Sequence, residues 1–212
     1  MITTRRRAAL RLAGLALAGL VLPLGPAHAA PDSDVTAPVA QFQAALSAVM
    51  KASGASFAQR YDMLAPVVER VFDLAVILRA CVGPRWQSFS PDQQAALGHV
   101  FAQFTTASWI ANFTGDSGAR FEILPDLRSV GADQIVQTRI LVPGREGHRI
   151  DFQMRQETDG WRVVDVLLDG TISRVAVQRS DFRRYVAENT ATPLINVLRK
   201  KVADLSGGSL PS

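Results

Sequence analysis

Residues 161–174 read WRVVDVLLDGTISR, and this stretch indicates a strand that is covered on both faces. Side chains alternate along a strand, so one face is predicted to carry Val164, Val166 and Leu168. The other face is predicted to carry Trp161, Val163, Asp165 and Leu167. Because both faces are mainly apolar, we expect helices on one of them and further apolar material on the other.

Two acidic residues interrupt this apolar stretch. Whether they are catalytic decides between an enzyme and a carrier protein. Asp165 lies between valines, where loss of solvent raises the pKa of a carboxyl and suits it to act as a base. The competing interpretation, which we favour, is that an arginine from a neighbouring element pairs with Asp165. Asp169 belongs to an Asp-Gly turn, in which its side chain bonds to nearby backbone.

Strands continue on the N-terminal side of this stretch. Asp159-Gly160 is a hairpin signal, so the strand at 161–168 is expected to pair antiparallel with the one at 148–157. A third strand is predicted at 135–142, and a fourth at 120–124 with a possible extension to 130. The sheet therefore has four or five antiparallel strands, which follow one another in the chain.

Helical periodicity dominates before residue 115. A helix is predicted between Thr36 and Gly54, and a second from Ser56 onward that Pro66 breaks and that ends at Gly83-Pro84. Ser90-Pro91-Asp92-Gln93 combines a cap, a first-turn proline and a capping-box glutamine. After the strands we expect helices near 180–188 and from Thr192 to Leu205, then a flexible tail at 206–212.

Helices followed by an antiparallel meander predict the α+β class, with N-terminal helices packed on a curved sheet that encloses an apolar pocket and with C-terminal helices behind them. Residues 30–205 are long enough for one domain with a substantial core. Cys81 is the single cysteine, so no disulfide forms within the chain, and we expect its side chain to be buried.

The first 29 residues are typical of a secretory signal peptide. Four arginines precede an apolar run at 12–24, which is too short to span a membrane, and Ala27-His28-Ala29 supplies a small-residue cleavage pattern. This leader carries four of the 23 basic residues and none of the 19 acidic ones, so 19 of each remain after cleavage. A neutral mature chain argues against nucleic-acid binding, and export predicts a periplasmic protein.

Catalytic groups are scarce. Outside the leader the chain has two histidines, His99 and His148, and we expect neither to be functional. The sequence shows no metal-ligand spacing, serine elbow or phosphate-binding glycine loop, so we expect no cofactor, no metal and no enzymatic activity.

Several segments together resemble the MlaC-type family, also called toluene-tolerance auxiliary proteins. They are VFDLAVILRACVGPRW (71–86), SPDQQAAL (90–97), WRVVDVLLDG (161–170) and ISRVAVQRSDF (172–182). Within the family they are most similar to the hopanoid-biosynthesis-associated HpnM branch. The chain departs from the family at Trp109, where relatives often carry tyrosine, and in DGTIS (169–173), where many relatives have valine before the serine.

The resemblance implies a periplasmic lipid-binding protein that ferries a phospholipid or hopanoid between the inner and outer membranes. Its implied partners are an inner-membrane ABC-type transporter and outer-membrane complexes, with transient contact near the membrane. It also implies helices packed on a curved sheet around a deep apolar pocket.

The residues that we expect to bind the lipid are apolar and lie on the predicted strand and helix faces. They are Phe72, Leu78, Phe101, Phe104, Val136, Ile140, Ile150, Phe152, Met154, Val164, Val166 and Leu168. Any one of them serves equally well as ordinary core. Two alternatives stay open: an enzyme for a hydrophobic small molecule with Asp165 as its base, and an adaptor whose apolar surface contacts only proteins.

Overall fold

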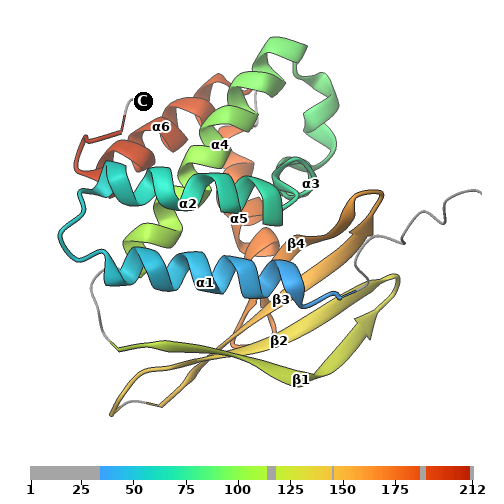
Figure 1. Ribbon diagram of the computed structural model, residues 1–212. Coiled ribbons are helices and arrows are strands. Elements are labelled where there is room, and N and C mark those ends of the chain that lie inside the picture. The colour runs from blue at the N-terminus through green and yellow to red at the C-terminus, as the bar shows by residue number, and fades with distance from the viewer. Residues whose placement is uncertain (1–33, 114–117, 145, 187–189, 211–212) are drawn as a thin grey trace, which may run out of the picture. The chain divides into compact units, whose positions relative to one another are not determined.

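The computed structural model describes residues 34–113, 118–144, 146–186 and 190–210. The predicted signal peptide lies outside these residues. In the described chain, helices come first, a five-stranded sheet follows, and further helices close the fold (Figure 1). The α-helices are α1 (Ala37–Lys51), α2 (Phe57–Val71), α3 (Leu74–Val82), α4 (Pro91–Asn112), α5 (Arg174–Phe182) and α6 (Thr192–Ser206). Short 3₁₀ helices occupy Gly83–Ser88 and Arg183–Tyr185. The predicted α+β class is confirmed.

The sheet is an antiparallel meander in which each strand pairs with the next along the chain. Its strands are β1 (Arg120–Val130), β2 (Asp133–Leu141), β3 (His148–Glu157), β4 (Gly160–Leu168) and β5 (Ile172–Ser173). Pairing of β1 with β2 shifts register between Ile123 and Leu127, a segment that contains Pro125. A proline and a bulge on an edge strand bend it. The helices lie together on one face of the twisted sheet (Figure 1).

Serine caps fix the starts of two helices in the helical layer. Ser90 accepts a hydrogen bond from the backbone nitrogen of Gln93, whose side chain accepts one from the backbone nitrogen of Ser90. Ser56 and Gln59 form the same reciprocal pair at the start of α2. Each pair satisfies two backbone donors that the first turn of a helix leaves open. The start predicted at Ser90 is confirmed.

The break predicted at Pro66 is wrong, because α2 continues through this residue to Val71. Pro66 and Asp62, whose carbonyl loses its helical hydrogen bond, are both exposed residues. The helix ends instead where Phe72 forms a parallel bridge with Val163 of β4. Asp73 then donates its backbone N–H to the Val163 carbonyl at 2.9 Å and caps α3 with its side chain. A contact with a strand distant in the sequence therefore places the break.

The helix predicted at 180–188 is also misplaced, since α5 begins at Arg174. Ser173 caps it by accepting a hydrogen bond from the backbone nitrogen of Ala176 at 3.0 Å. At the C-terminal side, α6 extends to Ser206, and Leu210 is buried in the core.

The strict alternation of side chains that we predicted along β4 is wrong as well. Met154 of β3 pairs with Val163 and Gln153 pairs with Asp165, which leaves Val164 without a partner. This bulge places Val163, rather than Val164, in the main core with Val166. Among the described residues Val164 and Leu167 are buried outside that core.

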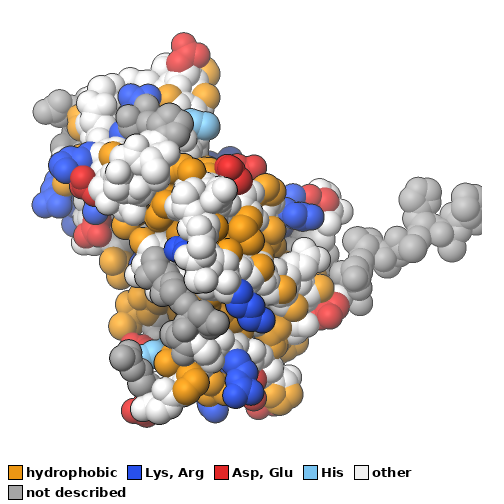
Figure 2. All heavy atoms as spheres, turned by 60° about the vertical axis from the view of Figure 1, so that its left-hand side comes forward, with side chains coloured by type: hydrophobic (Ala, Val, Ile, Leu, Met, Phe, Trp, Pro, Cys, Tyr) orange, Lys and Arg blue, Asp and Glu red, His pale blue; other side chains and the backbone are white. Residues whose placement is uncertain are grey.

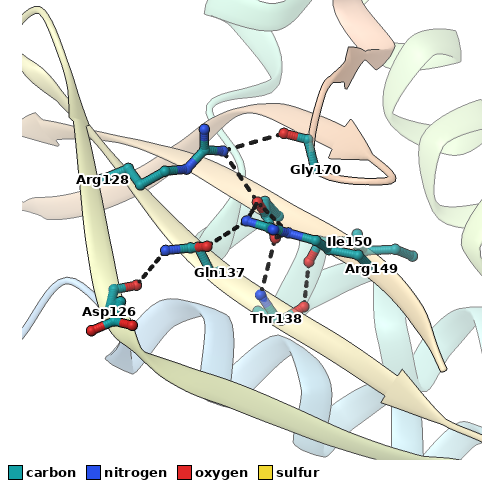
Figure 3. Close-up of polar contacts among 8 residues, drawn as sticks. Asp126, Arg128, Gln137, Thr138, Arg149, Ile150 and Gly170 are labelled. Carbon is teal, nitrogen blue, oxygen red and sulfur yellow. Dashed lines mark hydrogen bonds and ion pairs between the residues drawn. The ribbon is translucent and has the colours of Figure 1, made fainter.

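The outer face of the sheet, opposite the helices, carries a polar network where we expected apolar cover (Figure 3). The Asp151 side chain is fully buried and accepts hydrogen bonds from Arg149 at 2.8 Å, from Arg128 at 3.3 Å and from the backbone nitrogen of Thr138 at 3.2 Å. Arg128 also donates to the Gly170 carbonyl in the β4–β5 turn. One carboxylate thus ties β1, β2, β3 and this turn together.

A second carboxylate repeats this arrangement further along the same face. Asp133 accepts hydrogen bonds from Gln153 at 2.7 Å and from Arg155 at 2.8 and 2.9 Å. The hydrogen bond from Arg155 lowers the pKa of Asp133 below its usual value. Elsewhere on the surface, the face in Figure 2 shows basic and acidic side chains interspersed with hydrophobic ones, in keeping with the equal numbers of basic and acidic residues after residue 29.

Candidate functional site

A cavity of about 290 Å³, which we call the central cavity, lies between the helical layer and the sheet. Helices α3, α4 and α5 form one side of it, and strands β3 and β4 form the other. Its lining residues are Phe72, Ile77, Phe101, Thr105, Ser108, Trp109, Asn112, Phe113, Ile150, Asp165, Val166, Leu168, Arg174, Val175 and Gln178. The volume is close to the lower end of pockets for drug-sized molecules, roughly 300–1,000 Å³.

The polar residues that α4 contributes to this wall bond within their own helix. Thr105 donates its hydroxyl hydrogen to the Phe101 carbonyl at 2.8 Å, and Ser108 donates to the Phe104 carbonyl at 2.7 Å. Asn112 donates to the Ser108 carbonyl in the same way, at 2.8 Å. These hydrogen bonds use both hydroxyl donors, which leaves the hydroxyl oxygens and the rest of the Asn112 amide as the polar groups of this wall. Phe101, Trp109 and Phe113 supply its apolar surface.

Polar groups gather where α5 meets the cavity. Arg174 and Gln178 are half-buried and lie one helical turn apart on α5. The Gln178 side-chain oxygen lies 3.4 Å from the Cys81 sulfur. Within the described part of the chain, the Arg174 guanidinium has no hydrogen bond or ion pair, so a cation is available beside an apolar hollow.

Asp165 lies beside the cavity, yet its carboxylate is engaged. One oxygen accepts the backbone N–H groups of Val166 at 2.7 Å and Val175 at 3.0 Å, and the other accepts the Ser173 hydroxyl. The partner is therefore not the arginine that we expected but the start of α5. A carboxylate near a helix N-terminus is stabilised by the helix dipole. Asp165 thus fixes α5 against β4.

Asp169 also has a structural position. Asp169 and Gly170 have positive φ angles of 50° and 73°, and the Thr171 N–H donates to the Leu168 carbonyl at 3.1 Å. These are the features of a type I′ hairpin turn. A Cβ atom on Gly170 would lie 2.6 Å from the Arg149 side chain, so the turn and the outer polar network require glycine here.

The residues predicted to bind lipid fall into three groups. Five line the central cavity: Phe72, Phe101, Ile150, Val166 and Leu168. Ile140 and Phe152 line a narrow void next to it. The structure places the remaining five in packed interior away from these hollows: Leu78, Phe104, Val136, Met154 and Val164. For these five, core packing is the role that the structure displays.

Sequence reasoning missed the lining that α4 provides beyond Phe101. Thr105, Trp109 and Phe113 follow Phe101 at intervals of four residues, and all four line the cavity. Residues four apart lie on the same side of a helix. This four-residue spacing is visible in the sequence and could have predicted these cavity-lining residues.

The other candidate reactive groups lie in places that do not suit chemistry. Cys81 is buried as predicted, and burial raises the pKa of its thiol to about 12, so the thiolate nucleophile is not formed near neutral pH. His99 and His148 are exposed and lie outside the cavity lining. In the residues described, no three histidine, cysteine or acidic side chains cluster as a metal site.

The MlaC protein family matches residues 39–200, which is most of the chain. The chain belongs to this family. The MlaC match covers every element that lines the central cavity. It does not distinguish the HpnM branch from the rest of the family.

A solved structure also matches, that of the phospholipid-binding protein from Ralstonia solanacearum in complex with a phospholipid. It has a TM-score of 0.68 and 17% sequence identity, and the match covers 82% of this chain and 99% of that one. The likeness confirms the MlaC-like fold. A search of curated proteins finds no match to the sequence. None of the helices described is both long and apolar enough to cross a membrane.

Proposed function

We propose that this MlaC-family protein is a periplasmic lipid carrier, which holds the apolar part of a phospholipid or hopanoid in the central cavity. The observation that carries the proposal is a mainly apolar hollow of about 290 Å³ with Arg174 in its lining, a cation that forms no ion pair with the described residues, while the Asp165 carboxylate in the same lining is bonded to the start of α5. That pairing suits a ligand with a hydrocarbon tail and an anionic head. The phospholipid in the structurally similar Ralstonia protein supports the same class of ligand.

The energetics of burial explain how such a carrier works. Keeping a tail of about 14 methylenes out of water contributes on the order of 11 kcal/mol, at about 0.8 kcal/mol per methylene. Moving the same tail from a membrane into a protein cavity gains little, because both surroundings are hydrocarbon. The cavity therefore makes an aqueous crossing possible without setting its direction.

We infer that direction comes from the partners. In this proposal an inner-membrane ABC-type transporter and an outer-membrane complex load and unload the carrier. The signal peptide predicted at residues 1–29 would export it to the space between them. The protein itself holds and releases lipid near each membrane.

The test is mass spectrometry of organic extracts from purified protein produced under several expression conditions. We expect about one lipid per chain, and its mass distinguishes a phospholipid from a hopanoid. Leu168→Trp fills the cavity and is expected to remove the lipid. Leu141→Trp is the matched control, because Leu141 lies on β2 with 41% of its surface exposed and outside the cavity lining. Lipid-free wild-type protein under all conditions contradicts the proposal.

An enzyme with Asp165 as general base is the second candidate, because Asp165 lies beside the cavity. Three hydrogen bonds to its oxygens favour a structural role instead. Asp165→Asn keeps the shape of the side chain and removes the charge. A carrier retains its ligand in this variant, whereas an acid–base catalyst loses turnover of a hydrophobic substrate. The third candidate is an adaptor that contacts only proteins. Such a protein would purify without lipid and together with a tightly bound protein partner.

A further inference from the structure

Three hollows adjoin one another in the described part of the chain. The second is a groove of about 650 Å³ between α1 and β1, which we call the α1–β1 groove. A narrow void of about 10 Å³ shares Trp109, Phe113 and Ile150 with the central cavity. It shares Gln43 and Phe121 with the α1–β1 groove. The void therefore lies between the two larger hollows.

This void is narrow in the structure. A volume of about 10 Å³ is at the lower limit for one water molecule, which needs roughly 10–15 Å³. A hydrocarbon chain that fills the central cavity cannot pass through such a gap. The central cavity and the α1–β1 groove are thus separate compartments as long as the side chains around the void stay in place.

Aromatic rings close the gap, and Trp109 is at their centre. Its ring lies 4.8 Å from that of Phe42, edge to face, and stacks on Phe113 at 5.8 Å and on Phe152 at 6.5 Å. Phe113 in turn lies 5.8 Å from Phe121, which lines the α1–β1 groove. Trp109 belongs to the last turn of α4, and its position is constrained because it packs against rings from α1 and β3.

We propose that Trp109 is a specificity-determining residue that sets how long an acyl chain the central cavity holds. Its ring forms the inner end of the cavity, and the α1–β1 groove lies on the continuation of the same path. This inference rests on the proposed lipid-carrier function. It goes beyond that function by assigning chain-length selection to one side chain.

The physical basis is the gain from each buried methylene. As long as a longer chain finds room, each added methylene increases affinity roughly fourfold, which corresponds to about 0.8 kcal/mol. Once the chain end meets the Trp109 ring, further methylenes must displace packed rings or remain in water, so the increase stops. A smaller side chain at this position opens the void and lets the chain end continue toward the groove.

The experiment measures affinity for lysophospholipids that have one acyl chain and differ only in its length. For wild-type protein we expect affinity to rise roughly fourfold per methylene up to a limiting length and then to level off. Trp109→Leu is expected to move that limit to longer chains. Trp109→Phe keeps an aromatic ring, so we expect it to move the limiting chain length less. This variant serves as the test if Trp109→Leu does not fold.

Trp161→Leu is the matched control. Trp161 is partly buried against the core, like Trp109, but it lies outside the linings of the three hollows. Its ring nitrogen has no hydrogen-bond partner among the described residues, so the substitution breaks no hydrogen bond there. We expect the limiting chain length to stay at the wild-type value.

The outcomes separate this inference from the function on which it rests. If wild-type protein binds none of these lysophospholipids and also purifies without a hopanoid, the carrier proposal fails and the chain-length inference fails with it. If wild-type protein binds with a limiting length that Trp109→Leu and Trp109→Phe leave unchanged, only the chain-length inference is overturned. An equal shift in Trp161→Leu also overturns it, because loosening of the core would then explain the change.

Discussion

The two faces of the sheet differ in packing, although the same strands form both. On the inner face, Ile150, Val166 and Leu168 pack toward the helices and line a hollow of about 290 Å³. On the outer face, Asp151 and Asp133 are buried, and arginine side chains complete their hydrogen bonds. The inner face thus has unfilled space, and the outer face has a filled polar network.

The two faces differ in how much they stabilise the fold and in how freely they can rearrange. A cavity lined by apolar groups forfeits dispersion contacts, so the wall around it stabilises the fold less than dense core does. A buried carboxylate is tolerated only when its hydrogen bonds are complete, so the outer face has little freedom to rearrange. We infer that the outer face maintains the sheet while the inner face is free to enclose a ligand.

The largest expected effect compares two side chains on the inner face. Met154 is fully buried in dense core, and Met154→Ala is expected to lower the free energy of unfolding by about 4 kcal/mol. Leu168 borders the central cavity, and Leu168→Ala is expected to cost only about 1 kcal/mol, because few contacts are lost beside an existing hollow. Urea unfolding of lipid-free protein measures both. Equal losses would mean that the cavity wall is packed as tightly as the core.

The next effect concerns the outer face. Asp151→Ala leaves Arg149, Arg128 and the Thr138 N–H without their shared acceptor, and we expect a loss of about 3 kcal/mol in unfolding free energy. Lipid content per folded chain should not change, because Asp151 lies outside the cavity lining. Asp126→Ala is the control, since Asp126 is exposed and joins this network only through its backbone carbonyl. Similar losses in both variants would contradict the role assigned to the network.

The smallest effect is a pH dependence. Because the hydrogen bond from Arg155 lowers the pKa of Asp133 in the folded state, this pair stabilises the fold above the unfolded pKa of about 3.9. The contribution is lost as the pH falls through the lower folded pKa. Asp133→Asn should therefore destabilise the protein by about 1 kcal/mol at pH 7 and weaken its acid sensitivity below pH 4. Urea midpoints from neutral to acidic pH measure both, and parallel profiles for the two proteins would refute the assignment.

Much of the fold follows from local signals in the sequence. Ser90 with Gln93 indicated the start of α4. The dipeptide Asp169-Gly170 indicated a turn, and both residues have positive φ angles in the structure. Hydrophobic periods near 3.6 before residue 115 and near 2 after it separated helices from strands. These signals act over a few residues, so no tertiary information is needed to interpret them.

The candidate site was predictable only in part. Phe101, Val166 and Leu168 were identified because an apolar residue on a strand or helix face must turn inward. Val164 was assigned to the pocket because alternation was assumed, and the bulge opposite Met154 changes its face. Trp109 was seen in the sequence only as a departure from its relatives, yet its ring ends the cavity.

The class of fold, the order of its helices and strands and the scarcity of catalytic groups follow from the amino-acid sequence, because they depend on local periodicity, capping and composition. The end of α2, the partner of Asp165 and the set of apolar side chains that border empty space follow from packing. Each of these depends on residues that are distant in the chain. Whether an apolar residue fills space or lines it is set by the volume that its neighbours leave, and that volume exists only once the helices have packed on the sheet.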